Sequence, residues 1–142
     1  MCLVIDANVA SDFNAPSEDA KPVLQRIQKG NLRIVAGPSL KRELFRTKIR
    51  GLYQQWLLAG KVVEFNDTQL AAAAADINGD LLASNDIHVL ALARASGSRL
   101  LFSRDEPLHS DFKNRKIINP KGKIYTSAKQ YRLLDEIKCN CH

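Results

Sequence analysis

The sequence predicts an α/β fold in which helices cover both faces of a central parallel sheet of about five strands. Short apolar runs typical of buried strands alternate along the chain with segments whose apolar residues have helical spacing. The chain has 142 residues and is 45% hydrophobic, which suits a single domain with a core of its own. Its apolar runs are too short and too interrupted to form a membrane-spanning helix.

The first half of the chain sets up this alternation. A buried strand is predicted over residues 2–6, which include β-branched side chains. The helix predicted over 17–29 ends before Gly30, a residue typical of the position after a helix. A second strand follows over 32–38. Apolar residues then recur with helical spacing over 40–58, which predicts one helix or two short ones, with Ser39 as the N-cap.

The second half of the chain repeats the pattern. Asp67 or Thr68 is expected to cap a helix that ends at Asn78-Gly79, and Asp86 begins a helix that ends before Gly97. The remaining predicted elements are strands over 61–65 and 99–103, a turn or short helix over 107–114, and a fifth strand over 116–119 that ends before Pro120 and Gly122. We therefore place one domain over residues 1–119 and a basic C-terminal extension over 120–142.

The net charge of +6 is unevenly distributed. Residues 1–112 are neutral, and residues 113–142 carry eight basic and two acidic side chains. Six basic residues and one acidic residue lie between positions 41 and 61, whereas positions 64–86 hold five acidic residues and no basic one. A basic face beside an acidic pocket suits a polyanion that must meet a metal ion. The alternative for the C-terminal segment is a solvated basic tail without a specific role.

Cysteine usage and the N-terminus bear on localisation. The chain has three cysteines, Cys2, Cys139 and Cys141, and its first residues show neither a basic segment nor an apolar segment of a secretory signal. An odd number of cysteines without such a signal favours reduced thiols. We therefore expect a cytoplasmic protein.

Four acidic residues are expected at one edge of the sheet: Asp6, Glu43, Asp86 and Asp105. In parallel α/β sheets, ligands bind beyond the carboxyl ends of the strands, where all four would lie. Clustered carboxylates repel each other unless a cation neutralises them, and oxygen ligands suit Mg²⁺ or Mn²⁺. Taken singly, Glu43 and Asp86 also suit helix N-termini, and Asp105 suits a turn. Together they predict a metal site.

Four segments resemble the signatures of PIN domains: "VIDANV", "SLKREL", "SNDIHVLALA" and "LLFSRDEPLHSDF", in that order within residues 1–119. The resemblance implies a three-layer α/β/α sandwich and a metal-dependent endoribonuclease that hydrolyses RNA phosphodiester bonds. Many small bacterial and archaeal PIN domains are VapC-type toxins, so the resemblance also implies RNA as a partner and makes an antitoxin protein a candidate. A homodimer is a further candidate partner. A membrane partner is not expected.

The resemblance also implies roles for particular residues. The acidic quartet of the family corresponds to Asp6, Glu43, Asp86 and Asp105, the hydroxyl residue before the last acid to Ser103, and the polar residue after the first acid to Asn8. Ser103 and Asn8 are expected to orient a carboxylate or the attacking water. This chain departs from the pattern at Asp111, which lies six residues after Asp105 instead of close to it. Asp111 could be a fifth ligand, an outer group or a cap.

Further residues are candidates for substrate contacts. The basic residues on or beside the Glu43 helix could hold a nucleic-acid backbone, as could the arginine before Asp105; these are Arg42, Arg46, Lys48, Arg50 and Arg104. His109 lies in the loop near the proposed site, where a substrate contact and a surface role are both open. His88 lies two residues after Asp86, about 200° around a helix, and is expected to point away from the metal.

Two other functions compete with the enzyme. A catalytically silent PIN scaffold could bind RNA or a protein partner, although it would not need the complete acidic quartet. A receiver-like phosphoacceptor would need a pair of acids directly after the first strand, whereas Asp6 is followed by Ala7.

Overall fold

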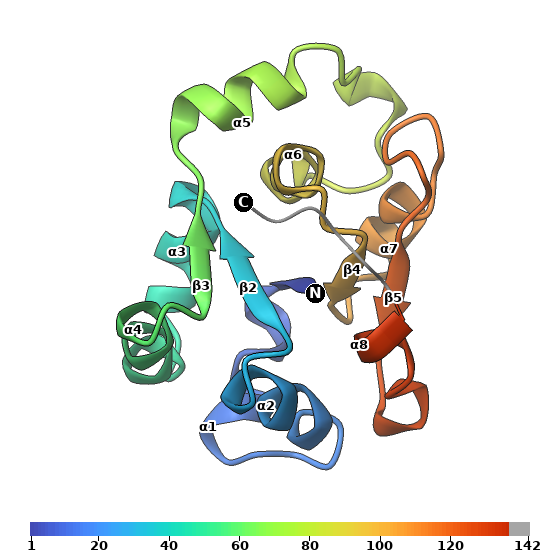
Figure 1. Cartoon of the computed structure of the whole chain (residues 1–142). Coiled ribbons are helices and arrows are strands. Elements are labelled where there is room, and N and C mark those ends of the chain that lie inside the picture. The colour runs from blue at the N-terminus through green and yellow to red at the C-terminus, as the bar shows by residue number, and fades with distance from the viewer. Residues whose placement is uncertain (137–142) are drawn as a thin grey trace.

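The computed structural model describes residues 1–136 and places its strands in one parallel sheet (Figure 1). The spatial order is β3-β2-β1-β4-β5, and each neighbouring pair runs parallel. The strands are β1 (Cys2–Ile5), β2 (Arg33–Ala36), β3 (Val62–Glu64), β4 (Leu100–Phe102) and β5 (Lys123–Tyr125). The predicted α/β class and parallel sheet are confirmed.

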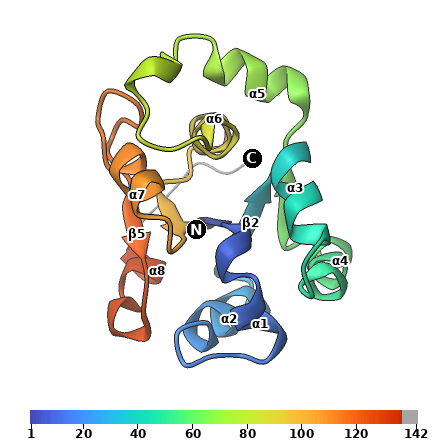
Figure 2. The same cartoon turned by 180° about the vertical axis from the view of Figure 1, so that it is seen from behind.

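Helices cover both faces of this sheet. Figures 1 and 2 show α5 and α6 on one side of it and α1 and α2 on the opposite side, as in a three-layer sandwich. The α-helices are α1 (Ser11–Asn14), α2 (Lys21–Gln28), α3 (Pro38–Phe45), α4 (Arg50–Leu58), α5 (Asp67–Ala74), α6 (Ile87–Ser96), α7 (Glu106–Phe112) and α8 (Leu133–Glu136). Short 3-10 turns are η1 (Ala7–Val9), η2 (Gly79–Leu81) and η3 (Ala128–Gln130).

The core explains why the central strands are apolar throughout. Every residue of β1 and β4 is buried, because helices pack on both faces of a parallel sheet. Phe102 of β4 forms edge-to-face contacts with Phe13 of α1 and Tyr125 of β5, with ring centroids 5.8 and 5.0 Å away. These contacts join the sheet to the helical layer and to its own edge strand.

The segment predicted as one helix or two over residues 40–58 forms two helices, α3 and α4. Between them, the Thr47 hydroxyl donates to the Leu44 carbonyl at 2.6 Å and accepts from the Ile49 amide at 3.3 Å. These bonds satisfy backbone groups where the first helix ends. The N-cap of α3 is Gly37, not Ser39, and Pro38 takes the first helical position, where its missing N–H costs nothing.

The prediction of the fifth strand was wrong. Residues 116–119 form a turn, in which the amides of Ile117 and Ile118 both donate to the Asn114 carbonyl, at 3.0 and 2.9 Å. The fifth strand is β5, which pairs with β4 from Leu100 to Phe102. The apolar pair misled the prediction because both isoleucines are buried without joining the sheet. The edge strand therefore lies within residues 120–142, the segment that we expected to be an extension.

Gly122 shows how the chain reaches β5. A Cβ atom at this position would lie 2.1 Å from two ring atoms of Phe112 and 2.8 Å from its carbonyl oxygen. The Gly122 amide donates to that carbonyl at 3.0 Å. We expected Gly122 to end a strand. It instead lets the backbone pass against α7 just before β5 begins.

Two further findings concern the expected localisation. Cys2, expected to carry a reduced thiol, is disulfide-bonded; an odd number of cysteines leaves one over but does not prevent a pair. Cys139 and Cys141 lie outside the described residues. Within residues 1–136, no helix combines the length and apolar character needed to cross a membrane.

Candidate metal centre

Three of the predicted acidic residues meet at the carboxyl edge of the sheet. Asp6, Asp86 and Asp105 each present a carboxylate oxygen, and these oxygens lie within 4.8 Å of one another. Asp6 is buried, with 8% of its surface exposed, and the other two are half-buried. We call these three residues the carboxylate cluster.

The sheet places Asp6 in this cluster. Asp6 directly follows β1, and its backbone amide donates to the Phe102 carbonyl of β4 at 3.0 Å. The two strands run parallel, so the residues that follow them emerge at the same edge. Ser103 and Asp105 follow β4 and therefore lie beside Asp6, although almost a hundred positions separate them in the sequence.

Ser103 is the centre of a hydrogen-bond network around Asp6. Its buried hydroxyl donates to Asp6 Oδ2 at 2.7 Å and accepts from the Asp105 amide at 3.0 Å. The Asn8 side-chain amide lies 3.4 Å from the same hydroxyl, and its oxygen accepts from the Arg104 amide at 3.2 Å. The predicted polar pair, Ser103 and Asn8, thus touches Asp6 and the start of the loop that carries Asp105.

Asp105 and Asp86 both sit at the start of a helix. Asp105 is the N-cap of α7, and its Oδ1 accepts from the Leu108 amide at 3.3 Å. His109 of the same helix has its Nε2 2.6 Å from the Ser103 carbonyl, so it braces the loop instead of facing open solvent. Asp86 is the N-cap of α6, but its side chain accepts no capping bond and is free to face the cluster.

Asp111 organises the loop that leads to Asp86. Its two carboxylate oxygens accept hydrogen bonds from the amides of Ala83 and Ser84, both at 2.8 Å, and from the Ser84 hydroxyl at 2.7 Å. The Ser84 hydroxyl in turn accepts from the Asp86 amide at 3.3 Å. Asp111 is 3% exposed and is not part of the carboxylate cluster. The structure therefore places it behind Asp86, with both oxygens engaged.

Glu43 lies apart from the other three acids. It is in the last turn of α3, not in the expected first turn, because the helix begins at Pro38. Its side chain is 40% exposed, and its Oε1 lies 3.5 Å from Nε2 of His88. The cluster of three therefore forms without Glu43, which stands beside a histidine.

His88 was expected to point away from the metal, and its nearest acidic partner is Glu43, which lies outside the carboxylate cluster. The rotation of 100° per residue holds only within a helix, and Asp86 has the non-helical backbone angles φ −101° and ψ 49°. The helix begins at Ile87, so the angle between the two side chains could not be counted from residue 86. Its imidazole faces Glu43, with Nε2 3.5 Å from Oε1 of that residue.

The electrostatics of the cluster disfavour the charged form of Asp86. Burial and the negative charge of Asp6 raise the pKa of Asp86 to about 6, and the adjacent carboxyl of Asp105 adds to the rise against an opposing effect of His88. A carboxyl group with so high a pKa is unfavourable in its charged form. A divalent cation would remove this penalty, and three carboxylates at these distances match the oxygen ligands that Mg²⁺ and Mn²⁺ prefer.

The predicted nucleic-acid-binding residues lie in two environments. Arg104 forms a bidentate ion pair with Asp12 of α1. Its Nη1 lies 3.2 Å from Asp12 Oδ1, and its Nη2 donates to Oδ2. Arg42, Arg46 and Arg50 border a groove of about 500 Å³ along α3 and α4, together with Pro38, Lys41 and Phe45. We call this the α3 groove. Lys48 is exposed and does not border it.

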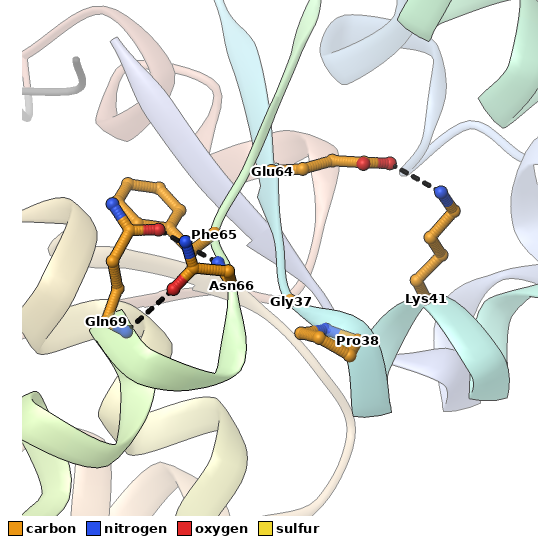
Figure 3. A pocket seen from close by; sticks show the side chains of 7 residues that line it. All are labelled: Gly37, Pro38, Lys41, Glu64, Phe65, Asn66 and Gln69. Carbon is orange, nitrogen blue, oxygen red and sulfur yellow. Dashed lines mark hydrogen bonds and ion pairs between the residues drawn. The ribbon is translucent and has the colours of Figure 1, made fainter.

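A second hollow, of about 420 Å³, lies beyond the ends of β2 and β3 (Figure 3). Its polar side chains already have partners: Lys41 pairs with Glu64 at 2.9 Å, and Asn66 and Gln69 form the capping box of α5. None of the carboxylate cluster lines this hollow or the α3 groove. The hollow therefore has few polar groups left to bind a ligand.

Several supporting contacts escaped prediction. The bonds of Asp111 to residues 83–84 and the pairing of Arg104 with Asp12 join segments far apart in the sequence. The one hint in the sequence was that Asp111 lies six residues after Asp105, so that the two carboxylates need not reach the same place.

No family model, curated protein or solved structure matches this chain.

Proposed function

We propose that this protein is a Mg²⁺- or Mn²⁺-dependent endoribonuclease, a PIN-like hydrolase of RNA phosphodiester bonds. The observation that carries the proposal is the carboxylate cluster, whose three ligand oxygens lie within 4.8 Å of one another at the ligand-binding edge of the sheet. When bound there, a divalent cation supplies Lewis-acid chemistry, which lowers the pKa of a water molecule and neutralises charge on a phosphate.

Each residue of the proposed site has a distinct role. Asp6, Asp86 and Asp105 hold the cation. Ser103 fixes the Asp6 carboxylate through its hydroxyl, so that one carboxylate oxygen has a set position. Asn8 anchors the Arg104 amide and so limits the motion of the loop before Asp105. For Glu43, which lies 3.5 Å from His88, a role as proton acceptor or as ligand of a second cation rests on the resemblance to PIN domains.

RNA as the substrate rests on charge and on the resemblance to PIN domains. The chain carries a net charge of +6, and the arginines of the α3 groove lie on or beside the helix that bears Glu43. Phosphate contacts of this kind position a nucleic acid without reading its sequence. A toxin role with an antitoxin partner and a homodimer would follow only from the resemblance; arrested growth on expression, relieved by a co-expressed partner, is its test.

Metal-dependent cleavage tests the proposal directly. Labelled RNA is incubated with pure protein in Mn²⁺, in Mg²⁺ and in chelator, beside Asp6→Asn as the matched variant. We expect cleavage in either metal, none in chelator and none by the variant. Equal cleavage with and without metal, or cleavage retained by Asp6→Asn, would contradict it. Binding of RNA without cleavage in both metals would instead favour the catalytically silent scaffold.

A further inference from the structure

The α3 groove gathers positive charge that has no carboxylate partner among the described residues. Three arginines border it, and within residues 1–136 none of them pairs with a carboxylate. Arg42 only donates to the Ser39 hydroxyl, at 3.2 Å. Arg46 and Arg50 are exposed. Guanidinium groups gathered in this way repel each other, and an anion that binds among them removes the repulsion.

An aromatic ring lies among these cations. Phe45 of α3 is half-buried, with the Arg50 guanidinium 5.0 Å and the Lys41 ammonium 5.5 Å from the centroid of its ring. Tyr53 of α4 contacts the ring edge to face, at 5.4 Å between centroids. Both the ring of Phe45 and the plane of the Arg50 guanidinium are surfaces on which a nucleic-acid base can stack.

Lys41 closes the groove on one side without adding free charge. Figure 3 shows Lys41 reaching from α3 to Glu64 of β3. The two charges lie 2.9 Å apart, and Glu64 also accepts from the Tyr53 hydroxyl at 2.8 Å. Lys41 borders both the α3 groove and the hollow beyond β2 and β3. The free positive charge therefore remains on the side of Arg42, Arg46 and Arg50.

We propose that the α3 groove is a subsite for single-stranded RNA, in which Phe45 stacks one unpaired base and Arg42, Arg46 and Arg50 bind the adjacent phosphates. The same helix carries Glu43 in its last turn. Duplex RNA would bind poorly, because its bases are already paired and stacked on one another and cannot stack on the Phe45 ring. This subsite rests on RNA being the substrate.

Binding in chelator tests the subsite separately from cleavage. The probe is a fluorescent single-stranded RNA of about 12 nucleotides, within the range that single-strand sites cover. Competitors are the same sequence as a duplex, inorganic polyphosphate and a glutamate-rich peptide. We expect wild-type protein to prefer the single strand over all three. Phe45→Leu should weaken binding of the single strand about tenfold and leave polyphosphate binding unchanged.

Further variants separate stacking from charge. Phe45→Trp keeps an aromatic face and should retain the affinity for the single strand. Arg46→Gln and Arg50→Gln should weaken binding of RNA and polyphosphate alike, and each should reduce the salt slope by about 0.7. Lys29→Gln, which removes one charge just after α2, is the control and should change neither. Thermal melting of each variant verifies folding.

Two results would overturn the subsite. One is unchanged affinity of Phe45→Leu and Arg50→Gln for the single strand. The other is tighter binding of the glutamate-rich peptide than of RNA, which would assign the groove to an acidic protein partner. Cleavage assays in Mn²⁺ are read independently. If RNA binds as expected but is not cleaved, the hydrolase proposal is wrong and the subsite proposal stands. If RNA is cleaved but the groove variants bind it as the wild type does, the subsite proposal is wrong and the hydrolase proposal stands.

Discussion

Asp6 shows at the scale of one residue how a carboxylate comes to stand at the end of a buried strand. It is almost entirely buried, and its Oδ2 accepts from the Ser103 hydroxyl at 2.7 Å. A buried carboxylate with one neutral donor is poorly compensated, and two further carboxylates lie close by. The metal-free protein therefore carries a repulsion that a cation at the cluster would relieve.

Asp6→Asn removes one charge from this cluster and keeps an oxygen that can accept from Ser103. We expect the metal-free variant to unfold at the same temperature as the wild type or at a higher one. Mn²⁺ should stabilise wild-type protein by roughly 2.7 kcal/mol at a hundredfold excess over its dissociation constant, and the variant much less. Thermal melting with and without Mn²⁺ measures both effects.

The control is Asp80→Asn, which removes an exposed carboxylate of η2 outside the cluster and should respond to Mn²⁺ as the wild type does. A large loss of metal-free stability in Asp6→Asn, with the Mn²⁺ response kept, would mean that Asp6 is a structural hydrogen-bonding residue.

The raised pKa of Asp86 predicts that both the stability of the metal-free protein and its affinity for Mn²⁺ depend on pH. Burial and the charge of Asp6 raise its pKa to about 6, above the value of an unfolded chain. The folded state therefore binds more protons between these two values, and this group stabilises the metal-free protein as pH falls through about 6. Protons also compete with the cation, so the Mn²⁺ dissociation constant should rise below about pH 6 and level off above it.

Urea unfolding in chelator on either side of pH 6 tests the first effect, with Asp86→Asn as the reference. The difference in unfolding free energy between wild type and Asp86→Asn should shrink as pH falls, because protonated Asp86 is neutral like asparagine. Calorimetric titration with Mn²⁺ tests the second. An Mn²⁺ dissociation constant that stays constant through pH 6 would exclude Asp86 as a ligand.

At the scale of elements, helix α7 supports the start of helix α6. Asp111 in the last turn of α7 accepts three hydrogen bonds from residues 83 and 84, just before Asp86. Asp105 at the other end of α7 belongs to the carboxylate cluster. One short helix thus contributes a carboxylate to the cluster and fixes the loop that carries another.

Asp111→Asn is expected to destabilise the fold because an amide N–H₂ would face a buried donor. The unfolding free energy should fall by about 1–3 kcal/mol, measured with urea. Ser84→Ala, which removes one hydroxyl and keeps both amide bonds, should cost less. Unchanged stability of Asp111→Asn together with loss of Mn²⁺ binding would make Asp111 a metal ligand, one of the roles that the sequence left open.

At the scale of the whole molecule, residues 120–136 complete the sheet. Tyr125 of β5 is fully buried, packs on Phe102 and donates its hydroxyl to the Asp19 carbonyl at 2.5 Å. Arg26 of α2 forms two bonds of 2.8 Å with Asp135 after that strand. The segment therefore ties one edge of the sheet to the layer of α2.

A chain that ends at Asn119 should consequently fold poorly. Loss of a large buried aromatic side chain alone costs about 3–5 kcal/mol, against the roughly 5–15 kcal/mol by which domains are stable. Circular dichroism during heating measures the effect. Replacing Lys121, Lys123 and Lys129 by glutamine removes charge without removing the strand; it should keep the melting temperature and flatten the salt dependence of RNA binding. An unaltered melting temperature of the shortened chain would contradict the structural role.

The sequence by itself determined the alternation of strands and helices, the first four strands and the residues that follow them. These depend on local patterns: apolar runs, helical spacing, and glycine or proline at the ends of elements. Parallel strands then bring Asp6 and Asp105 to one edge whatever the details of packing. The prediction of a strand over 116–119 was wrong because a pair of buried apolar residues occurs in turns as well as in strands.

Only the tertiary structure decided which acids meet. It placed Asp86 with Asp6 and Asp105, turned Glu43 toward His88, and engaged both oxygens of Asp111 with residues 83–84. It also moved the fifth strand to β5. These outcomes depend on the angle at which each helix leaves the sheet and on bonds between residues far apart in sequence. Such contacts have no local signature, because the partners are brought together only when the whole chain has folded.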